Sequence, residues 1–291
     1  MPEPGFISAL RSLALHPAAR GLADDAAVLE FGGEALVMTH DMMVEGIHWM
    51  PGQDPADIAW KLVAVNLSDL AAKGAEPMGV LLGYTLGTGD ARFIEGLREA
   101  LDTFGVPLLG GDTVSPGGPQ VHGITALGRA TYRPVPSRAG AGPGDTLWLT
   151  GPVGAAMMGF ESVRDAGADD STAFRRPLPL LAAGRALAPL VTAMMDVSDG
   201  LLLDASRLAQ ASGVTLSIDA MAVPLSTLVP PARRGEALRW GDDYQLLFTL
   251  PAGMKPPISA NRIGLAGPGG PAPVLLDGTA PTGTLGYIHG E

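Results

Sequence analysis

Acidic side chains stand beside glycines or after apolar runs in five short segments of this sequence. The segments are Ala23–Ala26, Thr39–Asp41, Asn66–Asp69, Gly110–Thr113 and Asp196–Gly200. Carboxylates with neighbouring hydroxyls are the hard oxygen ligands that Mg²⁺ prefers, and glycine lets the backbone approach a phosphate closely. Together, the five segments predict a site at which several metal ions hold phosphate groups.

Each segment taken alone also has an ordinary structural interpretation. The first could cap a helix or lie in a solvated turn, the second could end a strand at the surface, and the fourth could be a simple turn. In the third, the i, i+3 spacing puts Asn66 and Asp69 on one helix face, which could simply meet solvent. The fifth is the most specific, because it follows an apolar strand and opens a helix whose N–H groups suit an anion.

The common lysine-based nucleotide motifs are absent from the sequence. There is no G-x-x-x-x-G-K-[ST] loop, and none of the lysines, Lys61, Lys73 and Lys255, lies in a segment of that kind. The H-R-D and D-F-G motifs of protein kinases are missing as well. Any nucleotide site must therefore depend on metal ions rather than on a phosphate-binding lysine.

Strands and helices must bring the acidic segments together. Apolar runs predict strands at Ala35–Met38, Val80–Leu86, Val121–Arg129, Thr146–Thr150, Thr192–Met195, Thr215–Ile218 and Gln245–Leu250. Apolar residues at helical spacing predict helices at Pro55–Ala72, Phe93–Phe104 and Leu201–Ser212. Asp41 and Asp196 would then stand at strand ends, where layered proteins usually form ligand sites. The mixture of elements favours an α+β architecture.

The Pro- and Gly-rich stretch Arg133–Gly144 has no apolar period and is typical of a connection between domains. We therefore expect two domains, at about residues 1–135 and 140–291. The last forty residues, which include the run Gly267–Pro273, are predicted to be mostly loop.

Composition narrows the class of protein. The 291 residues carry 19 Lys and Arg against 30 Asp and Glu, a net charge of −11, which argues against a nucleic-acid surface because such a surface needs a basic stripe. The absence of cysteine excludes disulfides, thiolate metal sites and cysteine nucleophiles. No apolar run reaches the ~18 residues of a membrane span, and no secretory signal opens the chain. We expect a cytoplasmic protein that does not bind membranes.

Seven motifs stand in a fixed order along the chain. They are ADDAAV (23–28), THDMMVEGIHW (39–49), VNLSDLAAKGAEP (65–77), GGDT (110–113), DVSDGLLLDASRLAQASGV (196–214), PLS (224–226) and GDDYQLLFTLP (241–251). In this order they resemble the thiamine-monophosphate kinases, a family within the aminoimidazole ribonucleotide synthetase superfamily. The resemblance implies an α+β fold of two mixed α/β domains. In that fold, an N-terminal ATP- and metal-binding domain would form the dimer interface.

The resemblance also implies an activity, the ATP-dependent phosphorylation of thiamine monophosphate to thiamine diphosphate by a homodimer that uses several Mg²⁺ ions. By position, the implied metal ligands are Asp25, Thr39, Asp41, Asp69, Asp112, Asp196 and Asp199. The implied ATP contacts are Gly111, Asp112, Ser198 and Arg138, and the implied substrate contacts are His48, Asp242 and Tyr287. His48, between Ile47 and Trp49, could equally be a packed histidine.

The implied reaction explains why the site would need acids that bind metal ions. The acceptor phosphate is already ionised at neutral pH, so the transfer needs neither a general base nor a covalent nucleophile. The obstacle is repulsion between two polyanions, since two unit charges ~4 Å apart cost about 4 kcal/mol even at an effective dielectric near 20. Metal ions that bridge both phosphates offset this repulsion and align an in-line transfer.

Four positions depart from the family pattern. Ala23 replaces the usual Gly before the first acid pair, and His40 stands where a second Thr is common. The family's G-A-R-x-G-D reads GAGPGD, with Gly142 in place of Arg, which leaves Arg138 as the stand-in phosphate contact. Asp242 stands where the family has Glu, which shortens that side chain by one methylene.

The missing arginine keeps a second hypothesis open, a non-catalytic regulator that binds a nucleotide or a thiamine phosphate. A third is another ATP-using enzyme of the same superfamily. The selenium and hydrogenase-maturation branches use a reactive cysteine or selenocysteine, which this chain lacks, and the purine-biosynthesis branch would lack the motif at 242–247. Turnover of thiamine monophosphate with Mg-ATP would separate the three hypotheses.

Overall fold

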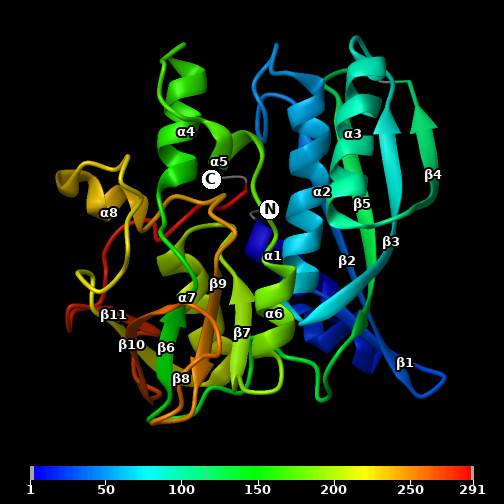
Figure 1. The fold of residues 1–291 in the computed structure, drawn as a ribbon. Coiled ribbons are helices and arrows are strands. Elements are labelled where there is room, and N and C mark those ends of the chain that lie inside the picture. The colour runs from blue at the N-terminus through cyan, green and yellow to red at the C-terminus, as the bar shows by residue number, and fades with distance from the viewer. Residues whose placement is uncertain (1–2, 116, 290–291) are drawn as a thin grey trace.

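Two β-sheets, with helices packed around and between them, make up the protein (Figure 1). The computed structural model describes residues 3–115 and 117–289. The first sheet has the strand order β1-β2-β5-β3-β4, and the second has the order β11-β8-β10-β6-β9-β7. Among the described strands, the pairs β3–β4 and β8–β11 are parallel and the other pairs are antiparallel. The predicted α+β class is confirmed.

The first sheet and its helices come from the first half of the chain. Its strands are β1 (Ala27–Phe31), β2 (Glu34–Val44), β3 (Ala75–Thr85), β4 (Leu108–Val114) and β5 (Val121–Ala130). The helices α2 (Pro55–Ala72) and α3 (Asp90–Phe104) cover one face of this sheet. Their shared core includes Val37, Val80 and Ile124, none of which is exposed.

The helix α2 forms as its sequence predicts. Asp54 caps it, with Oδ1 accepting a hydrogen bond from the backbone N–H of Ala56 at 3.0 Å. The helix ends at Ala72 with Lys73 as its C-cap, and Gly74 follows with a φ of 58°, a left-handed conformation that glycine adopts without strain. In α2, 16 of the 18 residues are buried, because the helix packs on the first sheet and also on α6 and β7 of the second half.

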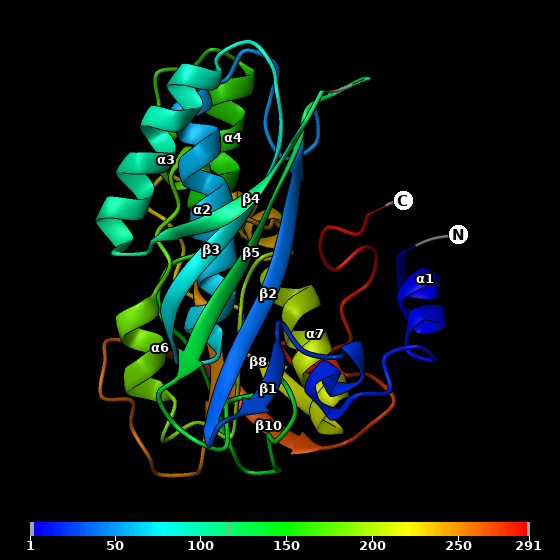
Figure 2. The same cartoon turned by 90° about the vertical axis from the view of Figure 1, so that its right-hand side faces the viewer.

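No described helix covers the opposite face of the first sheet (Figure 2). Side chains alternate along β2, so that Val37 and Thr39 are buried toward the helices while His40 and Met42 are exposed. Other large apolar side chains are exposed on the neighbouring strands of this sheet: Met78, Leu81, Leu108, Leu109 and Val114.

The second half of the chain forms the second sheet. Its strands are β6 (Thr146–Leu149), β7 (Ala193–Asp196), β8 (Val214–Ile218), β9 (Leu246–Leu250), β10 (Asn261–Pro268) and β11 (Val274–Leu276). The helix α7 (Leu201–Ser212) packs on β7, β8 and β11. The remaining α-helices are α1 (Glu3–Leu10), α4 (Ala155–Arg164), α5 (Thr172–Arg175), α6 (Leu181–Leu187) and α8 (Arg234–Ala237). Short 3₁₀ helices lie at Pro17–Leu22 and Pro231–Arg233.

The two ends of the described chain lie close together. The helix α1 stands beside the C-terminal segment in both views (Figures 1 and 2), and the backbone N–H of His289 donates to the Glu3 carboxylate at 3.2 Å. Within residues 3–115 and 117–289, no helix is both long enough and apolar enough to cross a membrane.

Two sequence interpretations of local structure are wrong. Asp41 does not end a strand, because β2 stays paired with β5 as far as Val44. The Gly110–Thr113 segment is not a turn but part of β4, paired in parallel with β3. The last forty residues are mostly loop, as predicted, and include two strands that the sequence did not indicate, β10 and β11, which pair on either side of β8.

Candidate active site and metal centre

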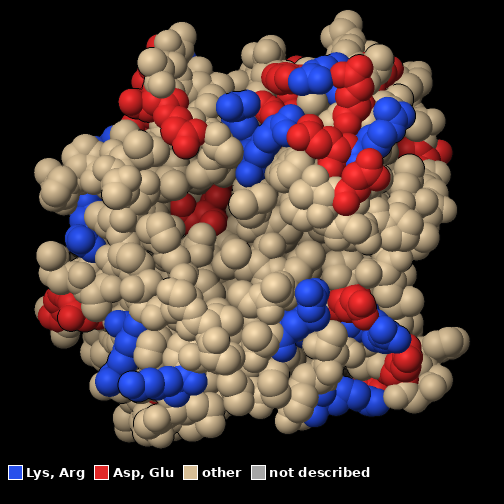
Figure 3. Space-filling model, viewed as in Figure 1, with Lys and Arg blue, Asp and Glu red and all other residues tan. Residues whose placement is uncertain are grey.

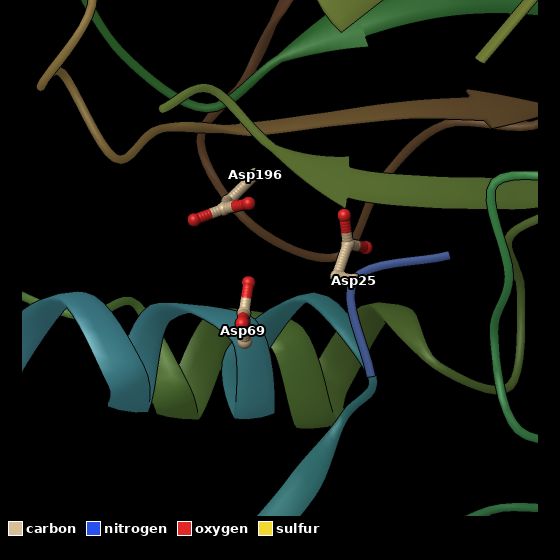
Figure 4. A group of neighbouring side chains, drawn as sticks. All are labelled: Asp25, Asp69 and Asp196. Carbon is tan, nitrogen blue, oxygen red and sulfur yellow. The ribbon is translucent and has the colours of Figure 1, made fainter. Parts of the chain in front are cut away.

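Three aspartates lie close together where the two halves of the chain meet, and two of them, Asp69 and Asp196, face each other in Figure 4. Asp25 lies in the segment before β1, Asp69 lies on α2, and Asp196 ends β7. One carboxylate oxygen from each lies within 4.8 Å of those of the other two. On the surface between the halves, acidic atoms are visible in a hollow (Figure 3).

Polar side chains of α2 and β2 fix this aspartate cluster, defined as Asp25, Asp69 and Asp196. The hydroxyl of Thr39 donates to the Asp69 carboxylate. The hydroxyl of Ser68 donates to Oδ2 of Asp196 at 2.6 Å. The first hydrogen bond joins β2 to α2, and the second joins α2 to the end of β7.

Asp41 lies beside the cluster and is tied to α2 through its backbone. Its N–H donates to Oδ1 of Asn66 at 2.9 Å, and the Asn66 amide donates to the Leu62 carbonyl at 2.9 Å. Asn66 has no exposed surface. The interpretation of Asn66 and Asp69 as a solvated helix face is therefore wrong.

Burial and mutual repulsion govern the protonation of these acids. Burial raises the pKa of Asp41 to about 6. The charge of His40 opposes this increase, whereas the negative charge of Asp199 adds to it. Burial, together with the charges of Asp41, Asp196 and Asp25, raises the pKa of Asp69 well above its usual range. Burial and the charge of Asp25 raise the pKa of Asp196 to about 8. Carboxylates that repel one another in this way are stabilised by a bound cation.

Two basic side chains bring positive charge to Asp25. Arg138 donates from Nε to Oδ1 of Asp25 at 2.6 Å. Nζ of Lys73 lies 2.6 Å from Oδ2 of the same carboxylate and also pairs with Asp24. Among the described residues, Oδ2 of Asp25 is buried and receives no hydrogen bond, so the lysine contact is an ion pair without hydrogen-bond geometry. A donor set made of oxygens alone, with several carboxylates that repel one another, fits a hard divalent cation such as Mg²⁺.

The loop between β7 and α7 is pinned by an acid that the sequence interpretation did not use. The backbone N–H groups of Ser198 and Asp199 donate to Oδ2 of Asp204 at 3.1 and 3.0 Å. Arg207 pairs with both Asp199 and Asp204. The expectation that these N–H groups receive an anionic ligand is wrong for this structure, because the buried Asp204 carboxylate occupies them. Asp199 remains close enough to Asp41 to raise its pKa.

The ring of His289 lies beside the rings of both predicted substrate residues, His48 and Tyr287. Nδ1 of His48, which is half-buried, accepts the backbone N–H of Val44 at 3.0 Å. The His48 ring centroid lies 5.4 Å from that of His289, whose ring is 4.8 Å from that of Tyr287. The backbone N–H of Tyr287 donates to the Asp199 carbonyl at 2.9 Å, which fastens the C-terminal segment to the loop after β7.

Asp242 is held from both sides. Its Oδ2 pairs with Nζ of Lys61 at 2.8 Å, and its Oδ1 accepts the hydroxyl hydrogen of Tyr244 at 2.8 Å. Nζ of Lys61 lies 4.1 Å from the ring centroid of Phe174 and 3.4 Å from the carbonyl oxygen of His48. Lys61 therefore joins Asp242 to the segment that carries His48.

Gly111 and Asp112 do not join the aspartate cluster within one chain. Strands β5 and β3 separate β4 from β2, so β4 and β2 lie roughly 14 Å apart. The register aligns Asp112 with Gly83, Gly123 and Met42, on the open face of the sheet, whereas Thr39 is buried toward the helices. A Cβ on Gly111 would lie 1.9 Å from the Leu82 carbonyl oxygen, so this glycine allows β4 to approach β3.

Besides Asp204 and Arg207, the residues of the site to which the sequence interpretation gave no role are Lys61, Lys73, Tyr244 and His289. Both lysines had been set aside because neither lies in a phosphate-binding loop, yet both are buried and paired with acids of the site. The sequence signal for Lys61 is its place within a helix that is otherwise mostly apolar, and Lys73 directly follows the last residue of the same helix. Tyr244 and His289 carry no signal beyond their closeness in sequence to Asp242 and Tyr287.

Comparison with known proteins matches both halves of the chain to family models. The AIR synthase related protein N-terminal domain matches residues 23–130, and the C-terminal domain matches residues 142–253. Proteins named thiamine-monophosphate kinase are similar in sequence. The one from Escherichia coli K12 is 37% identical over 79% of this chain and 76% of its own length. The one from Caulobacter vibrioides is 41% identical over 80% and 72%.

Solved structures are similar over nearly the whole chain. A structure described as AaThiL complexed with AMPPCP and TMP has a TM-score of 0.89 at 27% identity, covering 99% of this chain and 97% of that one. Thiamine-monophosphate kinase from Stenotrophomonas maltophilia has a TM-score of 0.78 at 32% identity, covering 95% and 96%.

Proposed function

The chain belongs to the thiamine-monophosphate kinases within the AIR synthase related proteins, and we propose that it transfers a phosphoryl group from ATP to thiamine monophosphate. The observation that carries this proposal is the convergence of Asp25, Asp69 and Asp196 in a fold similar to one complexed with AMPPCP and TMP. AMPPCP stands in for ATP, with a methylene group in place of the oxygen between its β- and γ-phosphates. The product would be thiamine diphosphate.

We propose that the acids of the site hold several Mg²⁺ ions, which when bound would screen the repulsion between the two phosphate groups and align them. The proposed ligands within one chain are Asp25, Thr39, Asp41, Asp69, Asp196 and Asp199. Their support is the oxygen-only donor set, the closeness of the Asp25, Asp69 and Asp196 carboxylates, and the raised pKa values of Asp41, Asp69 and Asp196. We propose a direct transfer, with neither a general base nor a covalent enzyme intermediate.

The proposed ATP contacts are Ser198, Arg138, Gly111 and Asp112. Arg138 pairs with Asp25. Cations bound at Asp25 would compete for that pairing, and the guanidinium would then be available to an ATP phosphate. Arg138 would in this way supply the basic contact that Gly142 cannot.

The proposed thiamine site is bounded by His48, Tyr287 and Asp242. The thiazolium ring of the substrate is cationic and aromatic, so a carboxylate and flat side chains suit it. Lys61 and Tyr244 fix the Asp242 carboxylate. This fixed position offers a physical reason why a shorter acid can serve where the family has Glu.

We propose that the protein is a homodimer formed through the open face of the first sheet, in the N-terminal domain at residues 1–135. This face exposes Met42, Leu81 and Leu109, and exposed apolar patches on sheets usually mark contact surfaces. Asp112 lies on the same face, so a second copy is the partner to whose site it could contribute. The second domain would span residues 140–291.

The test is conversion of thiamine monophosphate by the purified full chain with Mg-ATP, followed by separation of the thiamine phosphates. We expect formation of thiamine diphosphate that depends on Mg²⁺ and stops in EDTA. Tight substrate binding without turnover would instead support a regulator, and trapping of a labelled phosphoenzyme would overturn direct transfer. We place the reaction in the cytoplasm, because its substrates are charged phosphorylated metabolites.

A further inference from the structure

Lys73 places a buried ammonium group directly against the acids of the metal centre. Its side chain has no exposed surface. Its Nζ pairs with Asp24, lies 2.6 Å from Oδ2 of Asp25, and donates to the Met194 carbonyl on β7 at 3.4 Å. Lysine is almost never fully buried unless it is paired, so this lysine has a specific electrostatic role.

The ammonium group contacts two neighbouring acids, Asp24 and Asp25, whose surroundings differ. Asp24 is also held by Arg20 and by the backbone N–H groups of Asp25 and Arg138. Against the effect of burial, Lys73 and Arg20 hold the pKa of Asp24 well below its usual range. Asp24 therefore has partners at both oxygens and lies outside the cluster, whereas Asp25, which pairs with Lys73 through Oδ2 and with Arg138 through Oδ1, also faces the cluster.

We propose that Lys73 is a built-in cation of the metal centre, which stabilises the metal-free protein and competes with a divalent ion for Asp25. This inference rests on the proposed function in one respect, that a divalent ion binds at Asp25. A positive charge held within a few ångströms of the ion's ligand repels the ion. Lys73 is a positioning residue, because it contacts the metal ligand and no reacting atom.

Two consequences of opposite sign follow from this arrangement. Removal of the ammonium group leaves buried carboxylates uncompensated, which destabilises the metal-free protein. The same removal deletes a repulsive charge beside the metal ion, which raises the affinity of the centre for divalent cations. A lysine with only a structural role would produce the first effect without the second.

The experiment compares the full-length wild-type protein with Lys73→Met, which keeps the length of the side chain without its charge. The matched control is Lys255→Met, because Lys255 is exposed and lies outside the site. Mn²⁺ and Mg²⁺ affinities are measured by calorimetry without nucleotide, and thermal unfolding is measured in EDTA and at rising Mg²⁺ concentrations. For Lys73→Met we expect a lower melting temperature in EDTA, at least ~10-fold tighter Mn²⁺ binding and a larger Mg²⁺-induced stabilisation. The control should match the wild type in all three.

Equal or weaker Mn²⁺ affinity in Lys73→Met would overturn the inference. If this variant does not fold, the double variant Lys73→Met, Asp24→Asn removes both members of the ion pair, and the same affinity comparison decides. A wild-type protein that neither binds these ions nor turns over substrate would refute the proposed function itself. A wild-type protein that turns over substrate, alongside variants with unchanged affinity, would refute only the role of Lys73.

Discussion

Replacement of Asp196 by Asn should stabilise the metal-free protein while it removes most of the turnover. Asp196 is 2% exposed and accepts a hydrogen bond from Ser68 at 2.6 Å. Asparagine keeps that acceptor and presents an amide to the neighbouring carboxylates of Asp25 and Asp69, which lie in the same cluster. The variant therefore removes a charge without leaving a cavity.

The size of the stabilisation follows from the pKa. Burial and the charge of Asp25 raise the pKa of Asp196 from 3.8 to about 8 in the folded protein. A raised carboxyl pKa means that the carboxyl's contribution to stability is fully present below pH 3.8 and is lost as the pH rises toward about 8. At pH 7 the cost of the ionisable group is about 4 kcal/mol, at 1.36 kcal/mol for each pH unit. Because its neighbours share the proton, we expect a gain of roughly 2–4 kcal/mol for Asp196→Asn.

The assay is thermal unfolding in EDTA between pH 4 and pH 8, with Asp165→Asn as the control because Asp165 is exposed and outside the site. The stability difference between Asp196→Asn and wild type should be near zero at pH 4 and grow with pH. At pH 7 the melting temperature of Asp196→Asn should exceed that of the wild type by roughly 5–10 °C. At saturating Mg²⁺, kcat should fall at least ~10²-fold, because a transition-state metal ligand is lost. Asp69→Asn should lower kcat to a similar extent.

Two results would refute this reasoning separately. A variant no more stable than wild type at pH 8 in EDTA would show that ionised Asp196 is not strained by its neighbours. Kinetics like those of the wild type at saturating Mg²⁺ would show that Asp196 is not a metal ligand. The control should leave both the melting temperature and kcat unchanged.

Three further predictions concern other parts of the molecule. Lys61→Met should raise KM for thiamine monophosphate at least ~10-fold with a smaller change in kcat, because Asp242 loses its charged partner; an unchanged KM would contradict this. Gly184→Ala should lower the free energy of unfolding by about 3 kcal/mol in a denaturant titration, because its Cβ would lie 1.9 Å from the Ala71 carbonyl oxygen; wild-type stability would be evidence against this packing of α6 on α2. Leu81→Arg should convert the proposed dimer to a monomer in light scattering, whereas Leu265→Arg, also at an exposed position but on the second sheet, should not.

Local signals predicted the elements well where apolar spacing and capping agreed. In α2, the Asp54 cap and the apolar spacing both pointed to the observed helix. The prediction failed at β4, where two successive glycines suggested a turn. Gly111 is needed there for the opposite reason, since a side chain would collide with Leu82 of the neighbouring strand. The sequence shows that a small residue is present but not whether a turn or a close strand contact requires it.

The sequence named the acids of the site, and Arg138 as a phosphate contact, but not the ion pairs that join acids to basic residues. Arg138 pairs with Asp25 across 113 positions, and Lys61 pairs with Asp242 across 181. No local periodicity connects residues so far apart, because their contacts depend on how the two halves of the chain pack. Asp112 shows the same limit, since the strand order and register place it on the open face of the sheet, away from the other acids.

The helix α2 explains why the polar residues of the site were harder to interpret than the apolar ones. The apolar spacing predicted this helix, and one interpretation left the side that carries Asn66 and Asp69 in solvent. The second half of the chain covers that side instead, so Lys61 and Lys73 are buried. A polar group buried this way must have a partner, and each of these partners comes from outside the helix. An amphipathic helix followed by a second domain can therefore indicate a site between domains, with its polar face as the floor of that site.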